Sequence, residues 1–277
     1  MRGLRVIALL ALSALAACEQ ETEGCLDFRA LRVDVGADNA CDDCCEYPRL
    51  SVQFVPLDIG PDTALRVSRG RDIVLGTGDT ARLLDLAFYV SDLALLLDGG
   101  GEVLLTDTLS FRQNAAATFE RVEESAVRIN ALAANSARIG TLLEARELTG
   151  LRLRLGLPPE LAGIRADAQR AGSLVAPTRD SLLVSADRAS LLGGYGQLAR
   201  PRADTLAPVR ASAEASEPFA FPFGSVVPVD RSFNVRVSIG IDVRGLAGLP
   251  AGTTVSGQVF AEALLRDARL LEVTVSR

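Results

Sequence analysis

Apolar and polar residues alternate along several short stretches of the chain. In residues 233–243 apolar side chains occupy every second position, and residues 151–157 repeat this pattern with alternate leucines. A period of two is typical of a β-strand with one buried face. Residues 52–57 predict an opening strand of the same kind, and residues 271–275 predict a closing one.

A hairpin is predicted between residues 84 and 105. Residues 84–97 form a long apolar run that predicts a bulged strand, and Asp98 is followed by three glycines before the short run 103–105. Glycines after Asp favour a tight turn between antiparallel strands. Short strands with Gly- and Pro-rich turns predict an all-β fold, an antiparallel β-sandwich of about 8 to 10 strands, over residues 49–277.

Two segments depart from this pattern. Residues 119–133 carry apolar side chains at a helical spacing in a run rich in Ala, Glu and Arg, which predicts one short helix or an insertion. Residues 196–218 are rich in Pro, Ala, Ser and Arg without a clear period, which predicts a long loop. Gly193 to Gly196 predict a flexible turn that carries Tyr195.

The start of the chain predicts a secretion signal. An apolar run over residues 6–17 follows Arg2 and Arg5, and small residues precede Cys18. Leu15 to Cys18 resemble the lipobox of bacterial lipoproteins. That resemblance implies cleavage before Cys18, lipidation of this residue, and an extracytoplasmic protein anchored by lipid to the outer membrane. The alternative is an ordinary signal peptide cut nearby, with Cys18 unmodified.

Composition argues against catalysis and against nucleic acid as a partner. The chain of 277 residues has a net charge of −6, contains no His and no Trp, and uses Arg as its only basic residue. Without His and Lys the usual nucleophile–base pairs, Schiff bases and P-loops are excluded. An acidic chain is poorly suited to neutralise phosphates along a nucleic acid. We therefore expect no enzyme.

A cysteine-rich collar separates the signal from the main domain. Residues 18–24 predict an acidic tether, interpreted as a solvated spacer or as an export signal that resembles the tethers of Bacteroidetes-type surface lipoproteins. The collar, residues 25–48, contains four cysteines, Cys25, Cys41, Cys44 and Cys45. An even number outside the cytoplasm predicts two disulfides in one of three connectivities. A bond between the adjacent Cys44 and Cys45 is the least favoured because its ring would be strained.

The collar also resembles a short repeat of extracellular bacterial proteins. Gly24-Cys25 matches the start of that repeat, and Cys45-Glu46-Tyr47 matches its end. The resemblance implies an outer bridge from Cys25 to Cys45, which leaves Cys41 to pair with Cys44.

Acidic residues are concentrated in the same segment. They are Asp27, Asp34, Asp38, Asp42 and Asp43. Oxygen-rich loops of this kind suit calcium, which takes six to eight oxygen ligands. The spacing is not that of an EF-hand, and the alternative interpretation is a solvated acidic loop held by disulfides.

The predicted hairpin resembles the core of MbnP-like domains, bacterial extracytoplasmic proteins of a family associated with copper binding. The matching residues are 86–95, LAFYVSDLAL, and 99–107; residues 151–158 and 223–246 resemble two further strands of the family. The resemblance implies a β-sandwich and a copper site built from His and an oxidised Trp. This chain has neither residue, so no copper ligand can be carried over and copper binding in that manner is not expected.

Tyr89, Ser91 and Asp92 lie in the most family-like stretch. They are candidates for contact with a ligand or with another envelope protein; the alternative is a structural role, in which Tyr89 packs in the sandwich and its neighbours complete a bulge. We expect a lipid-anchored binding or accessory protein. The alternatives are a structural envelope lipoprotein, with or without calcium, and a carboxylate-based hydrolase, which needs two facing acids.

Overall fold

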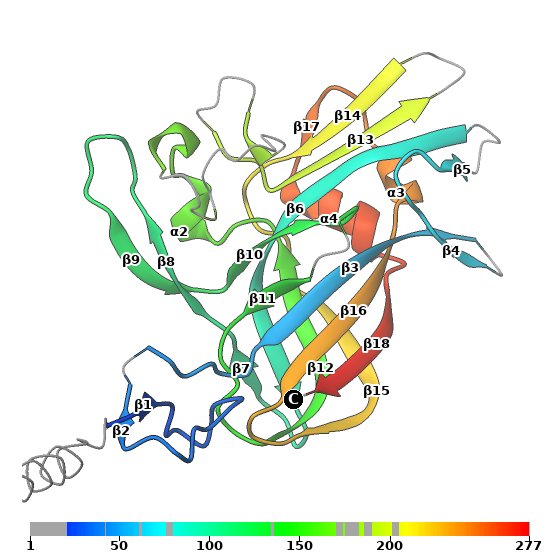
Figure 1. Ribbon diagram of the computed structural model, residues 1–277. Coiled ribbons are helices and arrows are strands. Elements are labelled where there is room, and N and C mark those ends of the chain that lie inside the picture. The colour runs from blue at the N-terminus through cyan, green and yellow to red at the C-terminus, as the bar shows by residue number, and fades with distance from the viewer. Residues whose placement is uncertain are drawn as a thin grey trace, which may run out of the picture.

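The computed structural model describes residues 21–41, 43–60, 63–75, 80–133, 136–169, 174, 183–185, 190–200 and 205–276. Strands dominate this part of the chain, and its helices are short (Figure 1). Two large sheets pack against each other and share one apolar core. The all-β prediction is confirmed.

The first sheet is organised around β6 (Thr80–Leu97), the long strand of the predicted hairpin. Its order is β15 (Phe219–Val229), β12 (Arg146–Leu155), β6, β13 (Gly194–Arg200), β14 (Thr205–Ala211) and β17 (Thr254–Val255). Three short strands also pair with β6: β5 (Asp72–Val74), β7 (Glu102–Leu104) and β10 (Ala126–Asn130). The pairing of β6 with β7 is antiparallel and confirms the predicted hairpin.

The second sheet has the order β11 (Ala137–Ile139), β3 (Leu50–Ile59), β16 (Asn234–Asp242) and β18 (Arg269–Ser276), and β4 (Ala64–Arg66) also pairs with β3. β3 and β16 run parallel, whereas β11 and β18 are antiparallel to their neighbours, so the sheet is mixed rather than purely antiparallel. The remaining elements are the hairpin of β8 (Asp107–Phe111) and β9 (Glu120–Glu124), and the helices α2 (Pro159–Ala162), η1 (Ala166–Ala168), α3 (Arg244–Ala247) and α4 (Gly257–Leu265).

The core lies between the two sheets. Phe54 of β3 meets Phe88 of β6 edge to face, with ring centroids 5.1 Å apart and an interplanar angle of 84°. Phe88 and Val90 point into this core, and beyond Asp92 the core positions of β6 shift to Leu93 and Leu95. Asp92 has a φ of 50°, so one left-handed residue changes which side chains of the strand face inward. This is the bulge that the long apolar run predicted.

Two segments differ from what the sequence predicted. Of the helix or insertion expected over residues 119–133, the helix is wrong. The segment contains strands β9 and β10, because Ser125 separates two short strands and shifts their alternation toward a helical spacing. Residues 196–218 include most of the β13–β14 hairpin rather than a long loop, and Tyr195 lies within β13. Helix α4 was not predicted. Within the described residues, no helix is both long and apolar enough to cross a membrane.

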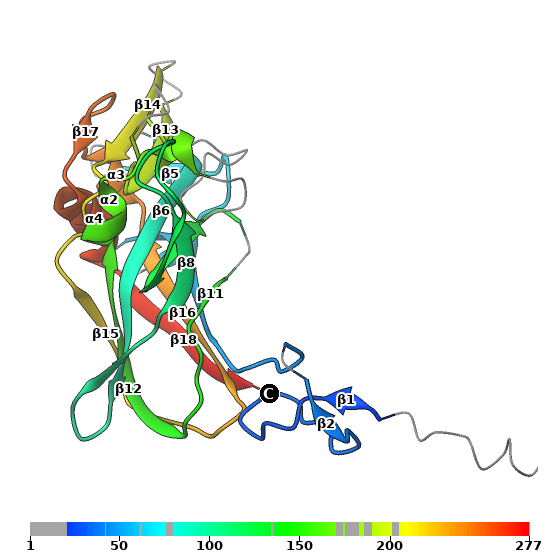
Figure 2. The same ribbon diagram turned by 90° about the vertical axis from the view of Figure 1, so that its left-hand side faces the viewer.

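The collar is a small unit at one end of the sandwich, where the last residues of β18 also lie (Figures 1 and 2). Two-residue strands β1 (Glu23–Gly24) and β2 (Asn39–Ala40) pair in parallel within it. It is attached by hydrogen bonds to β16 and to the turn that precedes this strand. Ser232 donates its hydroxyl to the Phe28 carbonyl at 3.1 Å, and the amide of Arg49, just after the collar, donates to Asn234 Oδ1 at 3.0 Å.

Candidate functional site at the collar

The collar is closed by two disulfides. Cys25 pairs with Cys45 and Cys41 pairs with Cys44, with Cα–Cα distances of 4.9 Å and 5.7 Å. This is the pairing that the repeat resemblance implied. Residues 1–20, which include the signal and Cys18, lie outside the described residues, so the structure does not bear on cleavage or lipidation.

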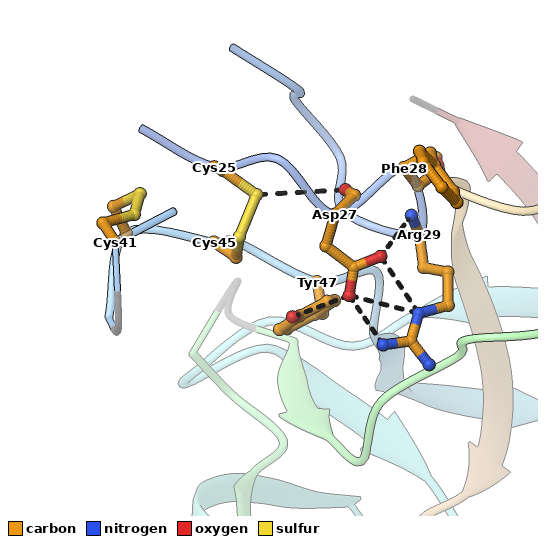
Figure 3. Close-up of a disulfide and its surroundings, with 9 residues drawn as sticks. Cys25, Asp27, Phe28, Arg29, Cys41, Cys45 and Tyr47 are labelled. Atoms are coloured by element: carbon orange, nitrogen blue, oxygen red, sulfur yellow. Dashed lines mark hydrogen bonds and ion pairs between the residues drawn. A yellow bond between two sulfur atoms is a disulfide. The ribbon is translucent and has the colours of Figure 1, made fainter. Parts of the chain in front are cut away.

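A charged network lies beside the Cys25–Cys45 bridge (Figure 3). The Asp27 carboxylate accepts hydrogen bonds from the Arg29 guanidinium at 2.7 to 3.1 Å, from the Arg29 amide at 2.9 Å and from the Tyr47 hydroxyl at 3.0 Å. These donors, Arg29 foremost, hold the pKa of Asp27 well below its usual range. The carboxylate in turn raises the pKa of Tyr47. Tyr47 is thereby fixed next to the sheet.

Two other acids of the collar accept hydrogen bonds from amide or hydroxyl groups. Asp34 Oδ1 accepts from the Gly36 amide at 3.1 Å, and Asp38 Oδ2 accepts from the amide and hydroxyl of Thr22 at 3.1 and 3.2 Å. Asp43 is exposed, and Asp42 lies outside the described residues. Among the residues that the structure describes, no three acidic or cysteine side chains converge as metal ligands.

Tyr89, Ser91 and Asp92 lie elsewhere, on β6. Tyr89 and Ser91 are buried, and Tyr89 packs in a second core that includes Leu157 and Leu161. Burial raises the pKa of Tyr89 to about 12. Asp92 forms an ion pair with Arg154 across the strand pair at 2.8 Å. These contacts stabilise the bulge and its surroundings.

A cleft of about 700 Å³ lies between the collar and the outer face of the second sheet. Collar residues Cys45, Glu46 and Tyr47 line one side of it. Strand residues that point away from the core line the other, because polar residues alternate with buried ones along β3 and β16. They include Ser51, Arg138, Asn234, Arg236, Thr274 and Ser276.

One row of this face runs directly across four strands. Arg138 of β11 pairs with Ser51 of β3, Ser51 pairs with Arg236 of β16, and Arg236 pairs with Thr274 of β18. Neighbouring strands are about 5 Å apart. Two arginines therefore flank one serine, with their backbones about 10 Å apart across that row.

The cleft is basic although the chain is acidic. Arg138 and Arg236 are exposed, and their side chains have no ion-pair or hydrogen-bond partner within the described part of the chain. Arg49, which also lines the cleft, has its Nη2 3.7 Å from Asp107 Oδ1. Glu46 is the only acid among the described lining residues. Guanidinium and hydroxyl groups are hydrogen-bond donors suited to anions. The arrangement can hold an anion.

Sequence reasoning missed this cleft. Its strand residues come from four strands that are far apart in the chain, and each looked like an ordinary solvent-facing position in an alternating pattern. The one indication is an arginine at a solvent-facing strand position with no acid beside it on the neighbouring strand. It can be recognised only once the strand register is known.

The comparisons give little further information. No protein-family model matches the chain, and no curated protein matches it. The solved structure of MbnP from Methylosinus trichosporium is similar over 76% of this chain and 81% of that chain, with a TM-score of 0.39 and 10% sequence identity. This likeness is too weak to carry a functional argument. The chain contains no His or Trp, and its four collar cysteines are in disulfides.

Proposed function

We propose that this chain is an extracytoplasmic binding protein, anchored through a lipidated Cys18, that takes a small polar ligand into the cleft between its collar and its second sheet. The observation that carries the proposal is the cleft itself. Its described lining offers several donors that face solvent without a protein partner, above all Arg138 and Arg236. Surface arginines elsewhere on the molecule are often paired, as Arg152 is with Glu102.

The collar supports the proposed location and the proposed site together. Disulfides form and persist outside the cytoplasm, and the collar contains two of them. They hold Cys45 to Tyr47 in place as one wall of the cleft. A wall fixed by covalent bonds loses little entropy when a ligand binds, so the site is organised in advance.

Binding, rather than catalysis, is the function that the cleft chemistry favours. Its described lining combines arginines and hydroxyls with one carboxylate, Glu46. General acid–base catalysis needs a group whose pKa lies near the working pH, and a two-carboxylate hydrolase needs a facing pair of acids. The described lining has one carboxylate and therefore no facing pair, and we propose that the site holds its ligand unchanged.

The ligand site is tested by nuclear magnetic resonance. The mature protein is labelled with ¹⁵N and titrated with a panel of small molecules that contains anionic, neutral and cationic compounds. The proposal expects at least one compound to give saturable shifts at Ser51, Thr141 and Thr274, which line the cleft. Shifts that gather at another surface, or none for the whole panel, would contradict it.

The anchor is tested separately by the intact mass and the location of the protein. Expressed with its own signal in a Gram-negative host, the protein should sediment with membranes and carry the mass of a lipidated cysteine. Cys18→Ser should be recovered without lipid and away from the membrane. An unmodified wild-type protein would refute the anchor and leave the cleft proposal intact.

A further inference from the structure

We infer that the cleft binds a phosphate group seated over Ser51, between Arg138 and Arg236. This inference rests on the proposed function and names the chemistry of its ligand. The cross-strand row sets the geometry, because Ser51 is the direct neighbour of Arg138 on one side and of Arg236 on the other. Two positive side chains therefore flank one hydroxyl.

The donors come from one row across the sheet. Arg138 and Arg236 lie on the two strands that flank Ser51, and all three residues line the cleft. Thr274 extends the row by one more hydroxyl beyond Arg236. A tetrahedral phosphate presents acceptor oxygens in several directions and can accept from both arginines and the serine at once.

A single carboxylate fits this arrangement less well. It is planar, has two oxygens, and is satisfied by the fork of one guanidinium in a bidentate pair. A phosphate monoester offers three such oxygens, one for each of the two arginines and for the serine. The charge of the ligand also favours phosphate over carboxylate. A phosphate monoester carries close to two negative charges at neutral pH and can balance both arginines.

The two arginines form one positive patch on the sheet. Arg138 and Arg236 lie on the same face with one strand between them, and both line the cleft. Other strand arginines of the molecule are neutralised locally, such as Arg82 by Asp72 on the adjacent strand. In the described part of the chain, Arg138 and Arg236 have no such partner.

The phosphate can come from a soluble ester or from a lipid headgroup. Glu21 is the first residue of the described chain, and Cys18 is three residues before it. An extended chain spans at most about 3.6 Å per residue, so a lipidated Cys18 would hold the collar close to the bilayer. The shared chemistry is the phosphate group, and the two sources are separated by experiment.

Calorimetric titration of the full mature protein with inorganic phosphate at low salt tests the inference. We expect saturable binding with one site per chain. Arg138→Gln and Arg236→Gln should each weaken it roughly tenfold to a hundredfold, the range for a hydrogen bond to a charged group. Arg269→Gln is the matched control, because Arg269 is an exposed arginine of β18 that does not line the cleft. It should bind as the wild type does.

Two further experiments identify whether the phosphate comes from a soluble ester or from a lipid headgroup. Tighter binding of glycerol 3-phosphate than of inorganic phosphate indicates a soluble ester. Arginine-dependent sedimentation of the Cys18→Ser protein with vesicles of phosphatidic acid in phosphatidylcholine, but not with phosphatidylcholine alone, indicates a lipid headgroup. Either result supports the phosphate site. Melting curves of all variants verify that each is folded, which the exposure of Arg138 and Arg236 leads us to expect.

The inference and the proposed function can fail separately. Equal weakening by Arg269→Gln would show general charge attraction and overturn the phosphate site. No binding of any phosphate probe, together with saturable shifts of cleft amides by a neutral compound, would overturn the phosphate site and retain a binding protein. If no probe of any charge perturbs the cleft, both are wrong.

Discussion

Replacing Cys25 and Cys45 together by serine should open the collar and leave the sandwich folded. The bridge joins residues 20 apart in sequence, whereas the Cys41–Cys44 bridge joins residues 3 apart. In the chain-entropy model, closing loops of these sizes stabilises the folded state by about 3.3 kcal/mol and about 1.9 kcal/mol respectively. The Cys41→Ser/Cys44→Ser variant is therefore the matched control, with the smaller effect.

The loss should fall on the collar because few contacts join it to the sheet. Ser232 donates a hydrogen bond to the Phe28 carbonyl. Asn234 accepts one from the amide of Arg49, where the chain leaves the collar. Urea-dependent trypsin cleavage after Arg29 and Arg32, two exposed arginines within the larger loop, reports the free energy of local opening. Circular dichroism follows the unfolding of the sheets in the same samples.

The expected result is a decrease in the collar opening free energy of about 3 kcal/mol for the larger bridge and about 2 kcal/mol for the smaller one, with the urea midpoint of the sheets unchanged. Equal cleavage of both double variants would refute the loop-length reasoning. A lowered urea midpoint of the sheets would show that the collar is part of the same cooperative unit as the sandwich.

Four further outcomes are expected. Gly194→Ala should lower the free energy of unfolding, measured by urea denaturation, by about 1 to 3 kcal/mol, because the new Cβ would lie 2.3 Å from the Phe260 ring. Gly163→Ala is the control and should not lower it, because nothing in the described part of the chain lies within 4 Å of a Cβ at Gly163. Asp27→Asn should lower the melting temperature most above about pH 5. The stabilising effect of a carboxyl with a depressed pKa is complete above its unfolded value of about 3.9 and is lost as pH falls from there toward the lower folded value. A difference that grows in acid would contradict this. Tyr89→Phe should remove an ultraviolet titration step near pH 12. EDTA should leave the melting temperature unchanged, because the described acidic side chains do not converge on a common point; a decrease reversed by calcium would place a calcium site in the collar.

Strands with uninterrupted alternation are the easiest to predict from the sequence. In β16, Val235 and Val237 are fully buried while Arg236 between them is exposed, so the period of two is visible in the sequence. Around Ser125 two short strands meet at an irregularity that mimics a helical period. In β13 the alternation cannot be seen in the sequence, because glycines stand at two positions where apolar side chains would be expected. Phe260 of α4 packs closely against Gly194, and Leu246 of α3 packs against Gly196.

The site was less predictable than the fold because it depends on register between distant segments. The collar could be recognised by its cysteines, and its disulfides have the pairing that the repeat implied. Its acids looked like metal ligands, yet Asp27 is engaged by Arg29 and Tyr47, which sequence spacing does not reveal. The cleft required the alignment of Arg138 with Arg236 across β3, which only the three-dimensional structure provides.

The central claim is that the cleft at the collar is the ligand site and that it receives a tetrahedral anion. The most direct measurement is an anomalous difference map from crystals soaked in tungstate, a heavy tetrahedral oxyanion. The account predicts a peak over Ser51, between Arg138 and Arg236, that is lost in the Arg236→Gln protein. A peak at another place on the molecule, or none in the cleft of a crystal that leaves it open to solvent, would contradict the claim.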